Sequence, residues 1–120
     1  MNEYETEVEA RWGHTLAYKE SRERTSKYTA EDFAMARADQ EAASEAFQFC
    51  FANGKAIDSE ETQKAVVMHR NAITKWFYDC SPEMQKNLAL MYLADERFKK
   101  YYDDLAKGLS QYVHDAIFAQ

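Results

Sequence analysis

Long helices are the main prediction from this sequence, because it offers few places where the chain can turn. The 120 residues contain three Gly and one Pro, which argues against many short strands joined by tight turns. Apolar residues recur instead at steps of three and four, the spacing of one helix face. We therefore expect one all-α domain of about five to six helices.

Two long helices are expected in the first two thirds of the chain. Thr29 is a good N-cap with Asp32 in the capping-box position, and Gly54 follows the helix as a stop after about Ala52. A second helix begins at Asp58 or Ser59 and spans about 30 Å if it continues to residue 78. The two apolar stripes are Phe33, Ala36, Gln40, Ala43, Phe47 and Cys50, then Thr62, Val66, His69, Ile73 and Trp76.

Three shorter helices are expected after residue 80. Ser81 is placed as an N-cap with Pro82 at the first helical position, and Asp95 caps a short fourth element. Their apolar faces are Met84, Leu88 and Met91, then Phe98, Tyr101 and Tyr102, and finally Leu105, Leu109, Tyr112, Ala116 and Ala119. Phe33, Phe47, Phe98 and Cys50 are predicted to belong to the core.

The first 28 residues differ from the rest in having no clear apolar stripe. They begin with acidic residues, carry charges of both signs between residues 19 and 27, and still contain Trp12, Leu16, Tyr18 and Tyr28. Such a segment is weakly held by its own packing and able to fold against something else. A surface helix with a few anchors is the other interpretation and, from the residues alone, the favoured one. We therefore divide the chain into an N-terminal segment, 1–28, and a helical core, 29–120.

Composition excludes several kinds of partner. A net charge of −6 argues against direct nucleic-acid binding and against a basic membrane-surface helix. No apolar stretch is long enough for a membrane span, and the acidic start is not a signal peptide. Cys50 and Cys80 lack the spacing of a zinc site. We expect a cytoplasmic protein with reduced thiols, no metal and no cofactor.

Residues 76–84 form the most distinctive local sequence and the first candidate site. Trp76, Phe77 and Tyr78 cannot all face one core, because neighbours on a helix point about 100° apart. Either one or two of them line a cleft, or packing on several sides buries all three. Cys80 lies just outside a helix N-terminus, where negative charge is favoured and a thiol can be partly ionised, although Asp79 opposes a second anion. From the residues alone, packing is the favoured role for Cys80.

His69 is the histidine that shares an apolar stripe with a residue of this region, Trp76. It shares its stripe with Ile73 and Trp76, so it faces either the core or a cleft. Eleven helical residues would separate it from Cys80 by about 16 Å, and only a break before Cys80 would allow a Cys–His dyad. A partly buried histidine with satisfied hydrogen bonds is the favoured interpretation. Nothing specific supports haem ligation.

Motifs along nearly the whole chain, in the right order, resemble the TipAS antibiotic-recognition domain. They are residues 7–13, 17–21, 28–32, 69–70, 78–80, 83–84, 91–98 and 108–117, which include Tyr78-Asp79-Cys80 and Gly108-Leu109-Ser110-Gln111-Tyr112. The resemblance implies an all-helical, globin-like fold without haem. It implies the effector-binding domain of a MerR-type transcriptional regulator, or a separate drug-sequestering protein, and no enzymatic activity.

The resemblance also implies a ligand and a way of holding it. Thiopeptide-like or other bulky hydrophobic antibiotics would bind in a cleft, and Cys80 matches the cysteine that can add to a dehydroalanine of the drug. The region around Trp12, Tyr18 and Tyr28 would act as a lid. The expected ligand-binding residues are Trp12, Tyr18, His69, Trp76, Phe77, Tyr78, Asp79, Cys80, Met84 and Tyr92.

The resemblance further implies a monomer as an isolated domain and a dimer in a full-length regulator, with DNA bound only through a helix-turn-helix outside these 120 residues. Two readings from other classes remain. A helical protein-interaction module would present a flat apolar patch rather than an enclosed cleft. A cysteine-dependent enzyme would need a base within hydrogen-bond reach of Cys80.

Overall fold

The computed structural model describes residues 16–120, and this part of the chain folds into six helices with no strand. The order is α2 (Leu16–Thr25), α3 (Ala30–Ala52), α4 (Glu60–Trp76), α5 (Pro82–Ala94), α6 (Glu96–Leu105) and α7 (Leu109–Phe118). The predicted all-α class is confirmed. None of the described helices is both long and apolar enough to cross a membrane.

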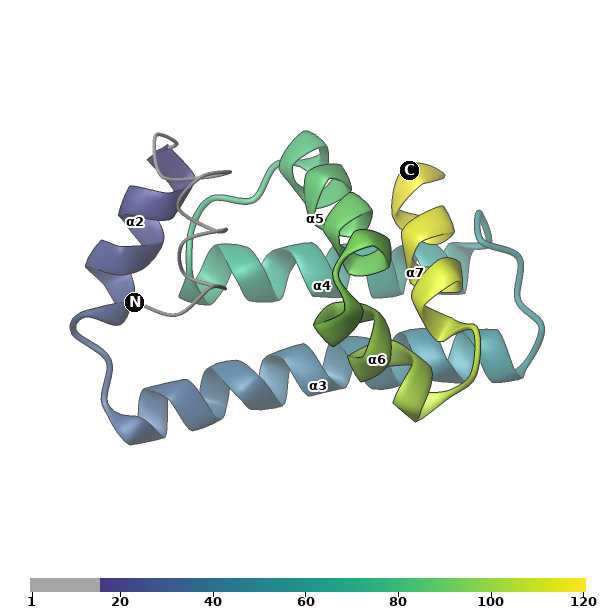
Figure 1. Ribbon diagram of the computed structural model, residues 1–120, viewed down its shortest axis with the longest axis horizontal. Helices are drawn as coiled ribbons and strands as arrows, with labels where there is room; N and C mark the ends of the chain where they lie inside the picture. Colours follow the sequence, from purple (N-terminus) through teal and green to yellow (C-terminus); the bar gives the residue numbers. More distant parts are fainter. Residues whose placement is uncertain (1–15) are drawn as a thin grey trace.

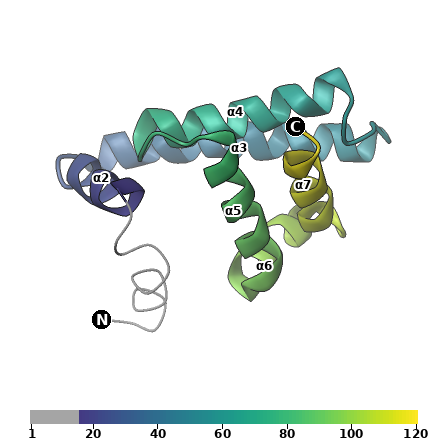
Figure 2. The same ribbon diagram turned by 90° about the horizontal axis from the view of Figure 1, so that it is seen from above.

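Two layers make up the fold. The long helices α3 and α4 lie side by side and form one layer, and α5, α6 and α7 form a second layer on one face of this pair (Figures 1 and 2). Helix α2 lies at the end of the pair where α3 begins and α4 ends (Figure 1). This arrangement leaves α2 on one side and α5 with α6 on the other, facing each other beneath the long pair (Figure 2).

The predicted helix starts agree with the caps that the structure contains. Thr29 and Asp32 form a reciprocal capping box at α3, and the hydroxyl groups of Ser59 and Ser81 accept backbone N–H groups at the starts of α4 and α5. Asp95 ends α5 and begins α6, accepting the N–H of Arg97. These residues fix where each helix begins without any help from distant contacts.

Two helix boundaries differ from the prediction. Helix α4 ends at Trp76 rather than Tyr78, because Phe77 leaves the helical conformation with φ −121° and ψ −60°. Leu105 ends α6 and does not belong to the last helix, because Gly108 turns the chain with φ 89° before α7 begins. A left-handed backbone of this kind favours glycine.

The main core lies where α3, α4, α5 and α7 meet. Its fully buried members include Phe47, Val66, Leu109, Val113 and Ile117, so the predicted core role of Phe47 is confirmed, as is that of Cys50. The predicted core role of Phe33 is wrong, because Phe33 is 41% exposed; its ring packs edge-on against Tyr28. A second, smaller cluster contains Ala17, Ile73, Tyr78 and Cys80.

Candidate functional site

Two adjoining cavities lie beneath the long helix pair. The inner chamber, of about 240 Å³, is lined by Gln40, Ser44, His69, Ile73, Tyr92, Phe98, Tyr101 and Tyr102. The outer chamber, of about 300 Å³, is lined by Ala17, Tyr18, Ser21, Arg22, Gln40, Ile73, Phe77, Tyr78, Leu88, Met91, Tyr92 and Phe98. Because Gln40, Ile73, Tyr92 and Phe98 line both, the chambers form one cleft.

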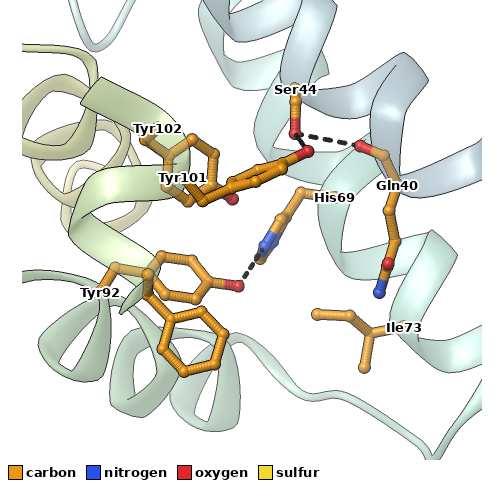
Figure 3. A pocket seen from close by; sticks show the side chains of 8 residues that line it. Gln40, Ser44, His69, Ile73, Tyr92, Tyr101 and Tyr102 are labelled. Carbon is orange, nitrogen blue, oxygen red and sulfur yellow. Dashed lines mark hydrogen bonds between the residues drawn. The ribbon is translucent and has the colours of Figure 1, made fainter. Parts of the chain in front are cut away.

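The inner chamber collects polar side chains from four helices (Figure 3). Gln40 and Ser44 come from one face of α3, His69 and Ile73 from α4, Tyr92 from α5, and the aromatic residues Phe98, Tyr101 and Tyr102 from α6. The spacing of four between Gln40 and Ser44, and between His69 and Ile73, places each pair on one side of its helix. Three tyrosine hydroxyl groups therefore converge on one chamber.

His69 is held at the back of the inner chamber by two hydrogen bonds. Its Nε2 lies 2.8 Å from the hydroxyl oxygen of Tyr92, and its Nδ1 lies 2.8 Å from Nε2 of the fully buried Gln85. Burial lowers the pKa of His69 to about 4, because the charged imidazolium would lose its hydration. The predicted interpretation of a buried, satisfied histidine is confirmed, and this histidine also faces the cleft.

Ser44 connects the polar groups on the α3 side of the chamber. Its hydroxyl group lies 3.1 Å from the backbone carbonyl oxygen of Gln40 and 3.2 Å from the hydroxyl oxygen of Tyr101 (Figure 3). Tyr101 is 44% exposed and stands at the edge of the protein, whereas burial raises the pKa of Tyr102 well above its ordinary value. The inner chamber is therefore polar at its rim and at its back.

The outer chamber has an apolar lining and a wall made by α2. Leu88 and Met91 of α5 face Ala17, Tyr18, Ser21 and Arg22 of α2 across it. The guanidinium of Arg22 lies 5.9 Å from the centre of the Tyr18 ring. Helix α2 is the predicted surface helix with a few anchors, and Ala17 is its buried anchor.

Two side chains from the α2 region fasten it to the end of α4. Arg24 donates to the backbone carbonyl oxygen of Thr74 at 2.6 Å and pairs with Glu20, while the hydroxyl group of Tyr28 donates to the carbonyl oxygen of Trp76. The last carbonyl groups of a helix have no partner within it. Arg24 and Tyr28 supply partners for two of them.

The three consecutive aromatic residues divide between two environments. Trp76 points away from the cleft, donates its Nε1–H to Asp39 at 2.7 Å and packs edge-on against Tyr28. This hydrogen bond is the main reason that the pKa of Asp39 is lowered. Phe77 and Tyr78 line the outer chamber, as the prediction of one or two cleft residues required. The end of α4 at Trp76 produces this division.

Cys80 is buried beside the outer chamber rather than in its lining. It packs with Ala17, Ile73 and Tyr78, and its N–H donates to the hydroxyl oxygen of Thr74 at 3.1 Å. Burial raises the pKa of the thiol to about 11, and Arg70 only partly opposes this shift. The favoured packing role of Cys80 agrees with this burial, and desolvation outweighs the effect of the nearby helix N-terminus on the thiol.

The remaining predicted site residues have different placements. Tyr18 and Tyr92 line the cleft. Met84 packs against the cluster around Cys80, and Asp79 points into solvent with 87% of its side chain exposed. Neither Asp79 nor Met84 belongs to the lining of the two chambers. Trp12 lies outside the described residues. Their roles in ligand binding, like those of Trp76 and Cys80, stay predictions.

Sequence reasoning missed the residues that α3 and α6 contribute to the site. Gln40 and Ser44 line the inner chamber together with Tyr101 and Tyr102. One signal was present in the sequence. Gln40 interrupts an otherwise apolar stripe, and a polar residue at such a position is either satisfied in the core or faces a cavity. The adjacent tyrosine pair gave no such indication.

Among the described residues, His69 is not available to Cys80 as a base. Both ring nitrogens of His69 are hydrogen-bonded to Tyr92 and Gln85, and the Cys80 sulfur has its own contact with the backbone oxygen of Ser81 at 3.7 Å. Within residues 16–120 no group of three His, Cys, Asp or Glu is placed to hold a metal ion. The features of the site are those of a binding cleft.

Comparison with known families identifies relatives over nearly the full length. The TipAS antibiotic-recognition domain matches residues 4–120. The HTH-type transcriptional activator TipA of Streptomyces coelicolor is 39% identical over 118 residues, which cover 98% of this chain and 47% of that protein. The HTH-type transcriptional activator mta of Bacillus subtilis is 30% identical over 95% of this chain and 43% of its own length. The chain thus spans less than half the length of these relatives.

A solved structure has a closely similar fold. It is the complex of nosiheptide with TipAS, from work on a thiopeptide antibiotic multidrug resistance system of Streptomyces lividans. The TM-score is 0.87 at 40% sequence identity, over 97% of this chain and 81% of that chain. At this identity and coverage, the resemblance extends through the whole helical domain, including the helices that surround the cleft.

Proposed function

The chain belongs to the TipAS antibiotic-recognition family, and on that premise we propose that it binds thiopeptide-like or other bulky hydrophobic antibiotics in the cleft between α2 and helices α3 to α6. The observation that carries this proposal is the cleft itself, with two adjoining chambers of about 240 and 300 Å³. Aromatic rings from the segment after α4, from α5 and from α6 surround an opening that α2 borders. Pockets for large, mainly apolar ligands have this composition.

The charge and lining of the cleft favour neutral or cationic antibiotics. The net charge of the chain is −6, so its field disfavours the approach of anions. The outer chamber offers Phe77, Tyr78, Leu88 and Met91 for apolar contact. The flat arrangement expected of a protein-interaction module has less support, because the two chambers lie between helices rather than on a flat face.

Helix α2 and the residues before it are proposed to act as the lid of this cleft. Arg24 and Tyr28 attach α2 to carbonyl oxygens at the end of α4, and Ala17 is its buried anchor in the described structure. A bound drug would add contacts along Tyr18 and Arg22. Those contacts would stabilise the closed lid, because a ligand favours the state to which it binds more tightly.

Calorimetry with nosiheptide tests this proposal directly. We expect wild-type protein to bind nosiheptide, and we expect Gln40→Trp to abolish binding by filling the boundary between the chambers. Met35→Trp is the matched control, since Met35 lies on the same helix and is 48% exposed outside the cleft. Absence of binding by wild type, or equal binding by Gln40→Trp, would refute the proposal.

We further propose covalent capture of the bound drug by Cys80. The thiolate sulfur would add to the terminal CH₂ carbon of a dehydroalanine, forming an S–C bond as the alkene π bond breaks, and the adjacent α-carbon would take up a proton. The buried thiol has a raised pKa of about 11, so binding would precede the reaction. A mass adduct should appear with wild type and Cys50→Ser and be absent with Cys80→Ser. An adduct that survives in Cys80→Ser would contradict this step.

The biological setting is proposed from the relatives. We place the chain in the cytoplasm as the drug-sensing part of a longer, dimeric MerR-type regulator, in which a separate helix-turn-helix would bind DNA. A stand-alone protein that sequesters antibiotic is the second candidate. An immunoblot of the natural host separates the two candidates. A single band at 14.0 kDa favours sequestration. A band at about twice that mass favours the regulator, because this chain covers 47% of its relative TipA.

A further inference from the structure

The position of the Gln85 side chain determines which ring nitrogen of His69 carries the proton. Nε2 of Gln85 lies 2.9 Å from the carbonyl oxygen of Val66 and 2.8 Å from Nδ1 of His69. A carbonyl oxygen only accepts, so the Gln85 atom at this position is the NH₂ nitrogen and donates to both partners. Nδ1 of His69 is therefore an acceptor, and in the neutral ring the proton lies on Nε2. His69 donates that proton to the Tyr92 oxygen at 2.8 Å.

Two hydroxyl protons on the α3 side of the chamber are committed within the protein. Ser44 donates to the backbone carbonyl oxygen of Gln40 at 3.1 Å. Since Ser44 has one proton, its contact with Tyr101 at 3.2 Å is donated by the tyrosine. The Tyr101 oxygen consequently faces the chamber with lone pairs and without a free proton.

Gln40, an exposed residue at the wall of this chamber, offers a side-chain amide with both a donor and an acceptor. Only the backbone of Gln40 is used in the bond from Ser44, and its side chain makes no hydrogen bond to the described residues. The side chain extends along the cavity toward Ile73 (Figure 3). The eight lining residues include no carboxylate, Lys or Arg, and burial lowers the pKa of His69 to about 4, so its ring is neutral at pH 7. A charged ligand group would enter this chamber without a counter-charge.

We propose that the inner chamber is a subsite for a neutral, planar lactam or amide edge of the ligand, read by the side-chain amide of Gln40. The ligand N–H would donate to Oε1 of Gln40 and the ligand carbonyl would accept from Nε2. A chamber of about 240 Å³ is larger than the roughly 150 Å³ cavity that holds benzene, so a fused bicyclic ring fits. This inference rests on the proposed function, because it assigns part of the ligand to part of the same cleft.

Four small probes of similar shape test the subsite in wild-type protein. Quinolin-2-one carries the N–H and C=O edge, naphthalene carries neither group, 2-naphthoate is an anion and 2-naphthylmethylamine is a cation at pH 7. Dissociation constants come from ¹H–¹⁵N NMR titrations, which also locate each probe by the shifts of amides near residues 40–44. We expect quinolin-2-one to bind about tenfold more tightly than naphthalene, the effect of one to two net hydrogen bonds. Both charged probes should bind more weakly than quinolin-2-one.

Two variants of Gln40 remove the amide in different ways. Gln40→Leu is expected to reduce the preference for quinolin-2-one over naphthalene to about twofold or less while leaving naphthalene binding intact. Gln40→Glu keeps the size of the side chain but removes its donor. Its preference for quinolin-2-one over naphthalene should fall as far as in Gln40→Leu. Gln111→Leu, on the exposed face of α7, is the matched control and should keep the tenfold preference. Preservation of that preference in Gln40→Leu, or 2-naphthoate binding as tightly as quinolin-2-one, would overturn the subsite.

A nosiheptide titration on the same samples separates this inference from the function. Nosiheptide binding together with an unselective inner chamber refutes the subsite and leaves the proposed function standing. Selective binding of quinolin-2-one without nosiheptide binding supports the subsite and refutes the thiopeptide proposal. Failure of both refutes both, because the probes and the antibiotic are measured independently.

Discussion

The two sides of the cleft are built in different ways. The side formed by α4, α5 and α6 is held by a buried chain of hydrogen bonds through Gln85, His69 and Tyr92, whereas α2 is attached mainly by Arg24, Tyr28 and one buried alanine. Buried networks are costly to disturb because their members have no water to replace a lost partner. We therefore expect the first side to keep the shape of the cleft and α2 to control ligand access.

The largest effect is expected from removing the centre of the buried network. Gln85→Leu would leave Nδ1 of the buried His69 without a partner and would remove the hydrogen bonds to the Val66 carbonyl and to Gln120. We expect the free energy of unfolding to fall by about 4 kcal/mol, from one unsatisfied buried group and the other hydrogen bonds lost with it, as measured by urea denaturation. Gln111→Leu, which loses one exposed bond to Asp115, should cost less than 1 kcal/mol. Equal losses in the two variants would remove the distinction between the two sides.

The second prediction concerns pH. The pKa of His69 is lowered from 6.5 to about 4 in the folded protein, so the unfolded chain binds the proton more readily. Stability is therefore complete above pH 6.5 and falls as pH drops toward 4, by about 3 kcal/mol in total. His69→Gln should flatten urea stability between these pH values. The lowered pKa values of Asp39 and Asp103 act below this window and should leave it unchanged.

A smaller effect is expected at α2. Arg24→Ala removes the donor to Thr74 and the pair with Glu20, and about 1 kcal/mol of local stability should be lost, since Arg24 is partly exposed. Hydrogen exchange should accelerate in residues 16–25 and remain unchanged in α4 and α5. Lys100→Ala, which removes an exposed pair with Asp104, is the control. Faster exchange throughout the domain would show that α2 is not a separate unit.

The smallest effect should appear at the thiols. Because Ala17 of α2 packs against Cys80, the 1 kcal/mol weakening in Arg24→Ala should speed iodoacetamide labelling of Cys80 about fivefold. Cys50 is buried in α3 away from that contact and serves as an internal control at its wild-type rate. Peptide mass mapping measures both thiols in one sample. Unchanged labelling of Cys80 would mean that α2 does not limit its access.

Local signals explain which parts of the molecule were predictable. Capping residues such as Thr29, Ser59 and Ser81 act within one helix turn, so the helix starts could be read directly from the sequence. The end of α4 was harder, because Phe77 leaves the helix while Tyr28 and Arg24 bind the final carbonyl groups. These partners lie about 50 residues away in the chain, and no local pattern contains them.

The candidate site shows the same limit. His69 and Tyr92 were identified, and the structure places both in the cleft. Tyr101 and Ser44 were missed because their hydroxyl groups meet across 57 positions of sequence. Cys80 was placed correctly at a helix start, but its pKa depends on the burial that Ala17 and Ile73 provide. Spacing along a helix predicts which face a residue occupies and leaves open what lies opposite.

Asp95 joins α5 to α6 directly, with no linker between the two helices. It ends α5 with its N–H bonded to Met91 and begins α6 by accepting the N–H of Arg97, whose guanidinium it also holds at 2.6 Å. Two helices that share one capping residue have no separate linker between them, so we expect Tyr92 and Phe98 on either side of the corner to keep their relative positions. A change in the shape of the cleft is then expected mainly from α2 and from the short segment between α4 and α5.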